Sequence, residues 1–214
     1  MLYTPWGYTY ASIRHIADEN VNYVRCYQYV MPFQQQRAGF VGMGPRKTEG
    51  VHGHVWVPID DTHTFVFNFL YARDGRALDP DDVYKMEHNA GRAAEDYISG
   101  TYFLNRNRAN DWLIDREVQK KVNYSGIMGV NTQDMALQET MGGIYDRTKE
   151  HLGSADSAII AARRLLMKAI KDVQAGLPPA GSRGEGDTIR PVEETIPVNI
   201  PWAEHFKQGL VSAL

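Results

Sequence analysis

The sequence predicts an α+β fold in which an antiparallel sheet is packed by one long C-terminal helix. Two observations predict it: the first third alternates with the period of strands, and residues 155–175 repeat apolar side chains with the period of a helix. With 214 residues, of which 43% are hydrophobic and 23% charged, the chain is long enough to bury a substantial core. We expect a domain at 1–176, followed by an extended, proline-rich tail at 177–214 that packs on its surface.

Two hairpins are expected in the first third. Residues 8–14 and 23–31 are separated by Asp18-Glu19-Asn20, which suits a turn, and residues 54–58 are joined to 64–71 by a short polar connection. Strands linked by short turns favour antiparallel pairing. Residues 33–51 contain four glycines and a proline before Val51, so we expect a mobile loop there.

Helical patterns follow Ala72. Asp79-Pro80-Asp81-Asp82 is typical of a helix start, and residues 115–121 predict a helical turn or two. The best helix is 155–175, with Ser154 as N-cap and Gly176 after its end. One apolar stripe of this helix should face the sheet, and it comprises Ile159, Ala162, Leu166, Ile170 and Val173.

Composition excludes several classes of function. The net charge of −3 argues against a nucleic-acid partner, which would need clustered basic residues. Neither a secretory signal nor an apolar run long enough for a membrane span is present in the sequence. The lone cysteine, Cys26, excludes a disulfide framework, and a cytoplasmic location is the simplest expectation.

The stretch 105–164 carries the most functional information. It contains Gln133-Asp134, then Gln138-Glu139-Thr140-Met141-Gly142, then Asp146-Arg147-Thr148 and Glu150-His151-Leu152-Gly153. This run resembles the C-terminal half of Rieske-type aromatic-ring oxygenases, in particular the phthalate 4,5-dioxygenase-like branch that acts on aromatic acids. Residues 8–58 are similar to the strand-rich catalytic half of the same family. The resemblance implies a helix-grip domain of the START/Bet v 1-like kind, so 1–176 would be a partial oxygenase catalytic domain.

Asp134 is the residue that matters most in this resemblance. From the residues alone, a carboxylate near a helix start on the edge of an apolar stripe usually caps free amides or meets the positive end of the helix dipole. The resemblance implies a different role, as the carboxylate of a 2-His-1-carboxylate site that leaves positions open on a mononuclear Fe(II). On this interpretation the side chain points into an apolar chamber.

The remaining cofactor ligands of that family have no match in the sequence. The two iron histidines are expected in a D/E-x-x-H-x4-H run, whereas Asp60-Asp61-Thr62-His63 is followed by four residues and then by Asn68. A Rieske [2Fe-2S] cluster needs two cysteines and two histidines, and Cys26 is alone. We therefore expect an N-terminally truncated catalytic portion, inactive by itself, with the cluster in the parent subunit only. His52 and His54 share a strand face but lie outside the family's ligand pattern.

The resemblance also implies substrate and partners. The substrate would be an aromatic acid, oxygenated with dioxygen, and the electrons would come from a reductase or ferredoxin to a homotrimer in the full-length form. Arg14 and Arg25, on neighbouring expected strands, could clamp the substrate carboxylate, with surface ion pairs as the alternative. An aromatic lining of the cavity is expected from Tyr27, Tyr29, Trp56, Phe65, Phe67 and Phe69. The alternative function is a non-catalytic helix-grip module that binds a small apolar ligand.

Overall fold

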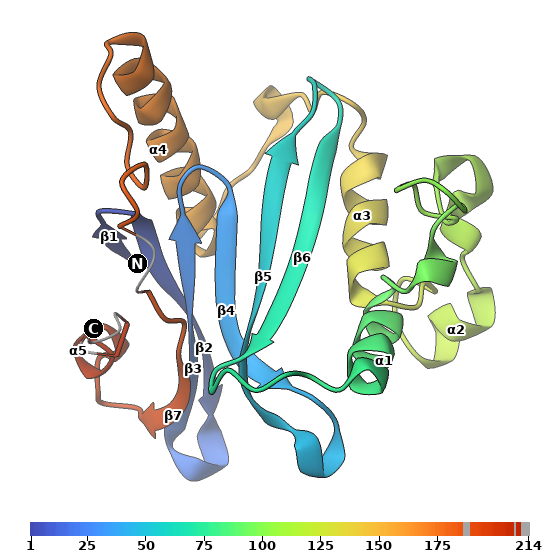
Figure 1. Ribbon diagram of the computed structural model, residues 1–214, viewed down its shortest axis with the longest axis horizontal. Helices are drawn as coiled ribbons and strands as arrows, with labels where there is room; N and C mark the ends of the chain where they lie inside the picture. Colours follow the sequence, from blue (N-terminus) through green and yellow to red (C-terminus); the bar gives the residue numbers. More distant parts are fainter. Residues whose placement is uncertain (186–188, 208, 211–214) are drawn as a thin grey trace.

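A computed structural model describes residues 1–185, 189–207 and 209–210, and it confirms the predicted fold class. A seven-stranded antiparallel sheet has the order β1-β2-β3-β4-β5-β6, with β7 paired to β3 (Figure 1). The strands are β1 Leu2–Thr4, β2 Gly7–Ile16, β3 Val21–Val30, β4 Gln34–Val41, β5 Thr48–Pro58, β6 Thr64–Ala72 and β7 Glu193–Pro197. The helices are α1 Pro80–Ala90, α2 Arg116–Lys121, α3 Val130–Thr140, α4 Ser157–Gln174 and α5 Trp202–His205.

Both predicted hairpins are confirmed. β2 and β3 pair from Gly7↔Val30 to Ile16↔Val21, and Asn20 turns the chain in the left-handed region with φ 53°. β5 and β6 pair from Gly50↔Ala72 to Pro58↔Thr64. Short polar turns and period-two alternation were sufficient to define these pairs.

The mobile loop expected at 33–51 is wrong, because β4 and the first part of β5 occupy most of it. Two glycines of β5, Gly50 at the end of this segment and Gly53 just beyond it, mark crowding in the sheet. A Cβ on Gly53 would lie 2.0 Å from Cζ of Phe69, and a Cβ on Gly50 would lie 2.5 Å from Cγ1 of Val41. Glycine at these strand positions lets neighbouring side chains close over the backbone.

The helices begin largely where the sequence predicts. The Asp79 carboxylate caps α1 by accepting hydrogen bonds from the backbone N–H groups of Asp81 and Asp82. The N-cap of α4 is Asp156 instead of Ser154, because residues 154–156 form a separate 3-10 turn. None of the helices in the described part of the chain has the length and apolarity that crossing a bilayer requires.

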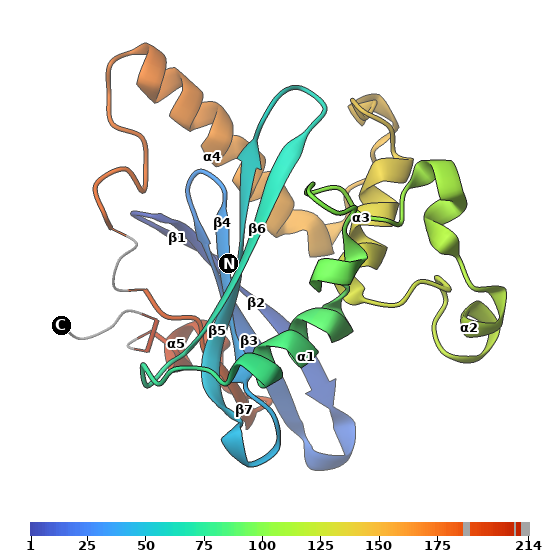
Figure 2. The ribbon, with the colours of Figure 1, turned by 45° about the vertical axis from the view of Figure 1, so that its right-hand side comes forward.

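The stripe expected to pack α4 on the sheet is wrong in part. Ile159, Ile170 and Val173 are 48%, 51% and 61% exposed, whereas Ala161 is buried. The Tyr8 hydroxyl donates a 2.8 Å hydrogen bond to the Ala158 carbonyl, so the N-terminal half of α4 lies against β2. Figure 2 shows the C-terminal half projecting beyond the strands, where it has no sheet to cover.

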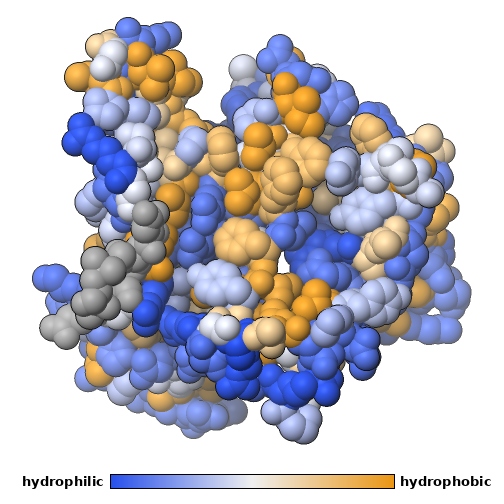
Figure 3. Space-filling view, viewed as in Figure 1, coloured by the Kyte–Doolittle hydropathy of each residue, from blue (hydrophilic) through white to orange (hydrophobic). Residues whose placement is uncertain are grey.

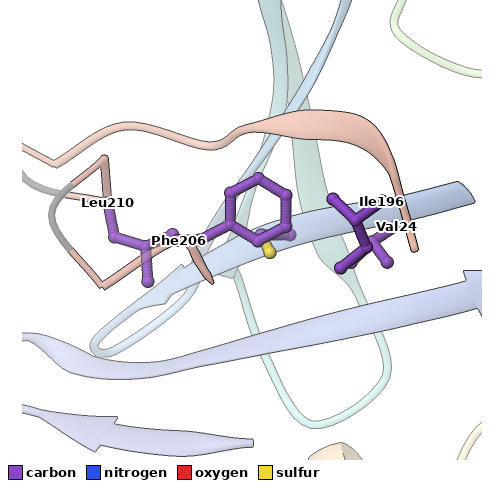
Figure 4. Close-up of a cluster of buried hydrophobic side chains, with 5 residues drawn as sticks. Val24, Ile196, Phe206 and Leu210 are labelled. Atoms are coloured by element: carbon purple, nitrogen blue, oxygen red, sulfur yellow. The ribbon is translucent and has the colours of Figure 1, made fainter. Parts of the chain in front are cut away.

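The tail contributes to the core, so its expected surface position is wrong. Ile196, Phe206 and Leu210 form a buried cluster with Val24 and Cys26 (Figure 4). Backbone pairing of β7 with β3 holds these side chains in place. The proposed division of the chain at residue 176 remains a prediction.

A buried polar network fixes the same tail. Gln28 is fully buried, and its Oε1 accepts hydrogen bonds from Thr9 Oγ1 at 2.7 Å and Trp6 Nε1 at 3.2 Å. Its Nε2 donates a 3.0 Å hydrogen bond to the Arg190 carbonyl. The network therefore satisfies the buried amide from both the sheet and the tail.

Candidate metal and substrate face

Strand register brings a set of polar and aromatic side chains onto one face of the sheet. One cross-strand row contains Tyr10, Tyr27, Arg37 and His52, and the next contains Tyr8, Tyr29, Gln35, His54 and Asn68. Residues opposite each other in an antiparallel sheet share a face. We call this surface, which includes these nine residues, the α3 face, because α3 contacts it through Asn68.

The expected aromatic lining is divided between two faces. Tyr27, Tyr29 and Trp56 lie on the α3 face, where Tyr10 and Tyr27 stack with ring centroids 4.8 Å apart. Phe65 and Phe67 lie on the opposite face, stacked on each other at 4.5 Å, and Phe69 shares that face. Hydrophobic residues gather along β5 and β6 in Figure 3. A single cavity lined by all six rings is therefore wrong, because alternation along β6 places its phenylalanines away from the α3 face.

The side-chain oxygen of Asn68, on β6, links three segments. They are β5, the residues that follow α1, and α3. Its Oδ1 accepts hydrogen bonds from His54 Nδ1 at 2.6 Å, Arg92 Nη1 at 3.0 Å and Asn131 Nδ2 at 3.3 Å. Thr132, the next residue of α3, is buried and donates from Oγ1 to the Gly91 carbonyl. These contacts fix the first turn of the helix that carries Asp134.

Asp134 lies on α3 one turn after this attachment. The helix begins at Val130 with Gly129 as N-cap and has no side-chain capping bond, so the capping alternative is wrong. The Asp134 side chain is exposed, so the expectation that it points into an apolar chamber is wrong. Burial lowers the pKa of His54 below its usual value, and the Asp134 carboxylate acts weakly in the opposite direction.

The apolar stripe on whose edge Asp134 lies is only partly buried. Leu137 and Met141 are 69% and 53% exposed, while Ala136 is buried with Trp112 and Ile127. The Trp112 Nε1 also donates a 3.0 Å hydrogen bond to Glu139 Oε2. This small cluster holds the far side of α3.

The donor set on the described residues does not complete an iron site. No group of three His, Cys, Asp or Glu side chains able to hold a metal exists within the described ranges. A 2-His-1-carboxylate site requires two imidazoles beside the carboxylate. Asp134 on its own therefore does not fit a resident iron, and we derive no reaction step through one.

Arg14 and Arg25 share the α3 side of the sheet but do not converge as a free clamp. Arg14 is exposed opposite Tyr23. Arg25 donates from Nε to Glu193 Oε2 at 2.7 Å and from Nη2 to the Tyr23 hydroxyl at 2.7 Å. Its guanidinium is already matched to a carboxylate on β7.

Sequence reasoning missed Arg37, Asn68 and Arg92. Arg37 fell in the segment interpreted as a loop, although its pairing with Tyr27 and His52 puts it on the Tyr27 side of the sheet. Recognising residues 34–41 as a strand would have identified Arg37. Arg92 follows the C-terminus of α1, and its hydrogen bond to Asn68 depends on tertiary structure.

The structure has an antiparallel sheet crossed by a long helix, with a carboxylate on a shorter helix beside the sheet. The sequence predicted this arrangement for an oxygenase catalytic portion. Over residues 1–206 the chain matches the family described as LigXa C-terminal domain like, and it belongs to this family. It is 31% identical over 175 residues to the oxygenase subunit of phthalate 4,5-dioxygenase from Pseudomonas putida, covering 81% of this chain and 38% of that protein. It is 27% identical over 211 residues to the oxygenase subunit of 3-chlorobenzoate-3,4-dioxygenase from Comamonas testosteroni, covering 91% of this chain and 46% of that protein.

These matches confirm the predicted resemblance to the C-terminal catalytic portion of Rieske-type oxygenase subunits. The chain spans less than half the length of the two curated relatives. Both relatives are oxygenase subunits of dioxygenases, which are oxidoreductases.

Proposed function

We propose that this chain is part of an oxygenase that acts on an aromatic acid with dioxygen at a mononuclear non-heme iron, by dihydroxylation, hydroxylation or O-demethylation. The observation that supports it best is family membership combined with the place of Asp134 on α3 beside the α3 face. In this proposal Asp134 supplies the carboxylate ligand. The two imidazoles come from the part of the oxygenase subunit that this chain does not span.

The chain's own contribution is a wall that orients the substrate. The tyrosine stack offers a flat apolar surface to a ring, and Arg14 and Arg25 remain proposed contacts for its carboxylate. A reductase or ferredoxin would supply electrons to a homotrimer of the complete subunit, in which a [2Fe-2S] cluster lies outside this chain.

The first test compares metal content. We expect no tight iron in the isolated 214-residue chain and stoichiometric iron in a complete subunit, measured by elemental analysis. Asp134→Asn in the complete subunit should remove the iron, whereas Asp81→Asn, a change at an exposed carboxylate on α1, should retain it. Full iron content in Asp134→Asn would refute the ligand assignment, and stoichiometric iron in the isolated chain would reveal histidine ligands on it.

The coding sequence provides a second test. If the reading frame continues upstream into a C-x-H…C-x-x-H motif and a paired-histidine run, the oxygenase proposal is supported. An independent translation start before Met1, together with tight binding of an apolar ligand by the iron-free chain, would favour the non-catalytic helix-grip module instead.

A further inference from the structure

The long helix α4 carries an apolar row that does not face the sheet. Ala161 is buried, whereas Ile159, Ile170 and Val173, on another side of the helix, are 48%, 51% and 61% exposed. Met167, beside this row, is 57% exposed. Contiguous apolar surface that is left open to water in this way marks a contact for another molecule.

The row has the spacing of a coiled-coil seam. Its residues recur at alternating intervals of four and three positions, which keeps one side of a helix facing a partner helix over several turns. The five positions are Ile159, Arg163, Leu166, Ile170 and Val173. Glu150 binds the Arg163 guanidinium with contacts of 2.5 and 2.7 Å, so the charge is neutralised while the methylene stem remains part of the row.

The charges of α4 favour a second copy of the same helix as the occupant of this seam. The positions that flank the row carry no charge, so two copies can approach without bringing like charges together. These flanking residues are Ile160, Ala162, Met167, Ala169 and Gln174. The basic residues Arg164, Lys168 and Lys171 lie away from the row. A partner selected by its charge would instead need charged positions beside the seam.

We propose that two copies of this chain associate through their α4 helices, packed antiparallel along this row. In Figure 2 the C-terminal half of α4 projects beyond the strands, whereas the N-terminal half lies against β2. Antiparallel packing places the two sheets at opposite ends of the seam, while parallel packing would make them compete for the same space. In a pair centred on Lys168, Ile170 of one copy meets Leu166 of the other. The inference goes beyond the proposed function, since it involves neither iron nor an aromatic substrate.

The size of the seam sets the strength of the pair. The 18 residues of α4 form a helix about 27 Å long, and a single seam of this length buries less than the roughly 1,200 Å² at which stable interfaces begin. Association should therefore be reversible and depend on concentration. Because α4 carries more basic than acidic residues, added salt should strengthen the pair by screening the repulsion between the two helices.

Analytical ultracentrifugation of the 214-residue chain tests the pair. The average mass should rise from 24.2 kDa at about 1 μM toward twice that value at about 1 mM, and NaCl should favour the heavier species. Ile170→Lys should raise the dissociation constant about tenfold or more, because it places a charge in the middle of the seam. Ile144→Lys makes the same chemical change at a 77% exposed position after α3, so this matched control should associate as the unmodified chain does.

Two further measurements separate association from folding and fix the direction of packing. Since Ile170 is half exposed, the free energy of unfolding of Ile170→Lys in urea, at low protein concentration, should match that of the unmodified chain. Spin labels can be attached through Gln174→Cys, because the native Cys26 is buried. In the antiparallel pair the two labels should lie about 18 Å apart along the helix axes, since roughly 12 helix positions separate them.

Each of these measurements has an outcome that would overturn the inference. A mass that stays at 24.2 kDa at about 1 mM, unchanged association of Ile170→Lys, or an equal loss in Ile144→Lys would do so. Association that NaCl weakens would reveal a contact held by opposite charges, and labels lying side by side would reveal parallel packing. A destabilised Ile170→Lys would place this side chain in the chain's own core. Iron content enters none of these outcomes, so the proposed function is judged separately.

Discussion

Replacing Asn68 by alanine tests whether one side chain fixes α3 on the sheet. The change removes an oxygen that accepts three hydrogen bonds, two from the neutral donors His54 and Asn131 and one from the cation Arg92. Neutral bonds contribute about 0.5–1.5 kcal/mol each and a bond to a charged group about 1.5–3 kcal/mol. All three donors are half-buried, so water replaces part of the loss, and we expect a net cost of about 2 kcal/mol.

The chain offers a matched control for this change. His15 and Asn22 form the same cross-strand pair, with His15 Nδ1 3.2 Å from Asn22 Oδ1, but at an exposed position on β2 and β3. Asn22→Ala should therefore cost less than about 0.5 kcal/mol. Urea unfolding of both variants at neutral pH gives the comparison.

Hydrogen exchange locates the effect. In Asn68→Ala the amides in the first turn of α3 should exchange faster, since Asn131 loses its attachment there, whereas the amides of β2 should be unchanged. Equal unfolding free energies for Asn68→Ala and Asn22→Ala, or unaltered exchange in α3, would refute the idea that Asn68 positions the Asp134 helix.

Three further predictions concern the core, the pH dependence and the glycines. Ile196→Ala, at a fully buried side chain of β7, should cost about 2–5 kcal/mol in urea unfolding, while Val198→Ala, 42% exposed on the same tail, should cost little; equal costs would contradict the core assignment. The Arg46 guanidinium lowers the pKa of Asp82 from 3.8 to about 2, so its contribution is present above pH 4 and is lost as the pH falls toward 2. Asp82→Asn should therefore be less stable than the unmodified chain at pH 6, with the difference shrinking at pH 2.5. Gly53→Ala should destabilise the sheet by about 1–3 kcal/mol or more, because its methyl group meets a phenyl ring of β6; unchanged thermal unfolding would show that the ring moves freely aside.

Local patterns were sufficient where each element could be identified from its own residues. Alternation and turn residues predicted β2, β3 and β6, and Asp79 indicated the start of α1. Local patterns failed where the structural role of a residue depends on a neighbouring strand. Gly50 and Gly53 look like loop residues in sequence, and only the side chains of Val41 and Phe69 across the sheet explain them.

Only part of the candidate site could be predicted from the sequence, for a related reason. Asp134 came from a family resemblance, which carries residue identity but no geometry. Its exposure and its attachment through Asn68 arise from contacts between segments more than sixty residues apart, which no local pattern reports. For Arg25 the sequence left a substrate clamp and a surface ion pair open, and it could not identify Glu193 as the partner because that residue lies 168 positions away.

The tail affects the pairing of charges on the α3 face, although its buried side chains lie on the opposite face of the sheet. β7 pairs with the first half of β3, while β4 pairs with the second half. This arrangement places Glu193 directly opposite Arg25, whereas Arg37, one strand further along, has no carboxylate ion-pair partner among the residues that the structure describes. The buried cluster of Ile196 and Phe206 holds β7 in that register, since a slip of one residue would turn Ile196 out of the core and Glu193 away from Arg25. Packing on one face of the sheet thereby fixes the ion pair of Arg25 with Glu193 on the other face.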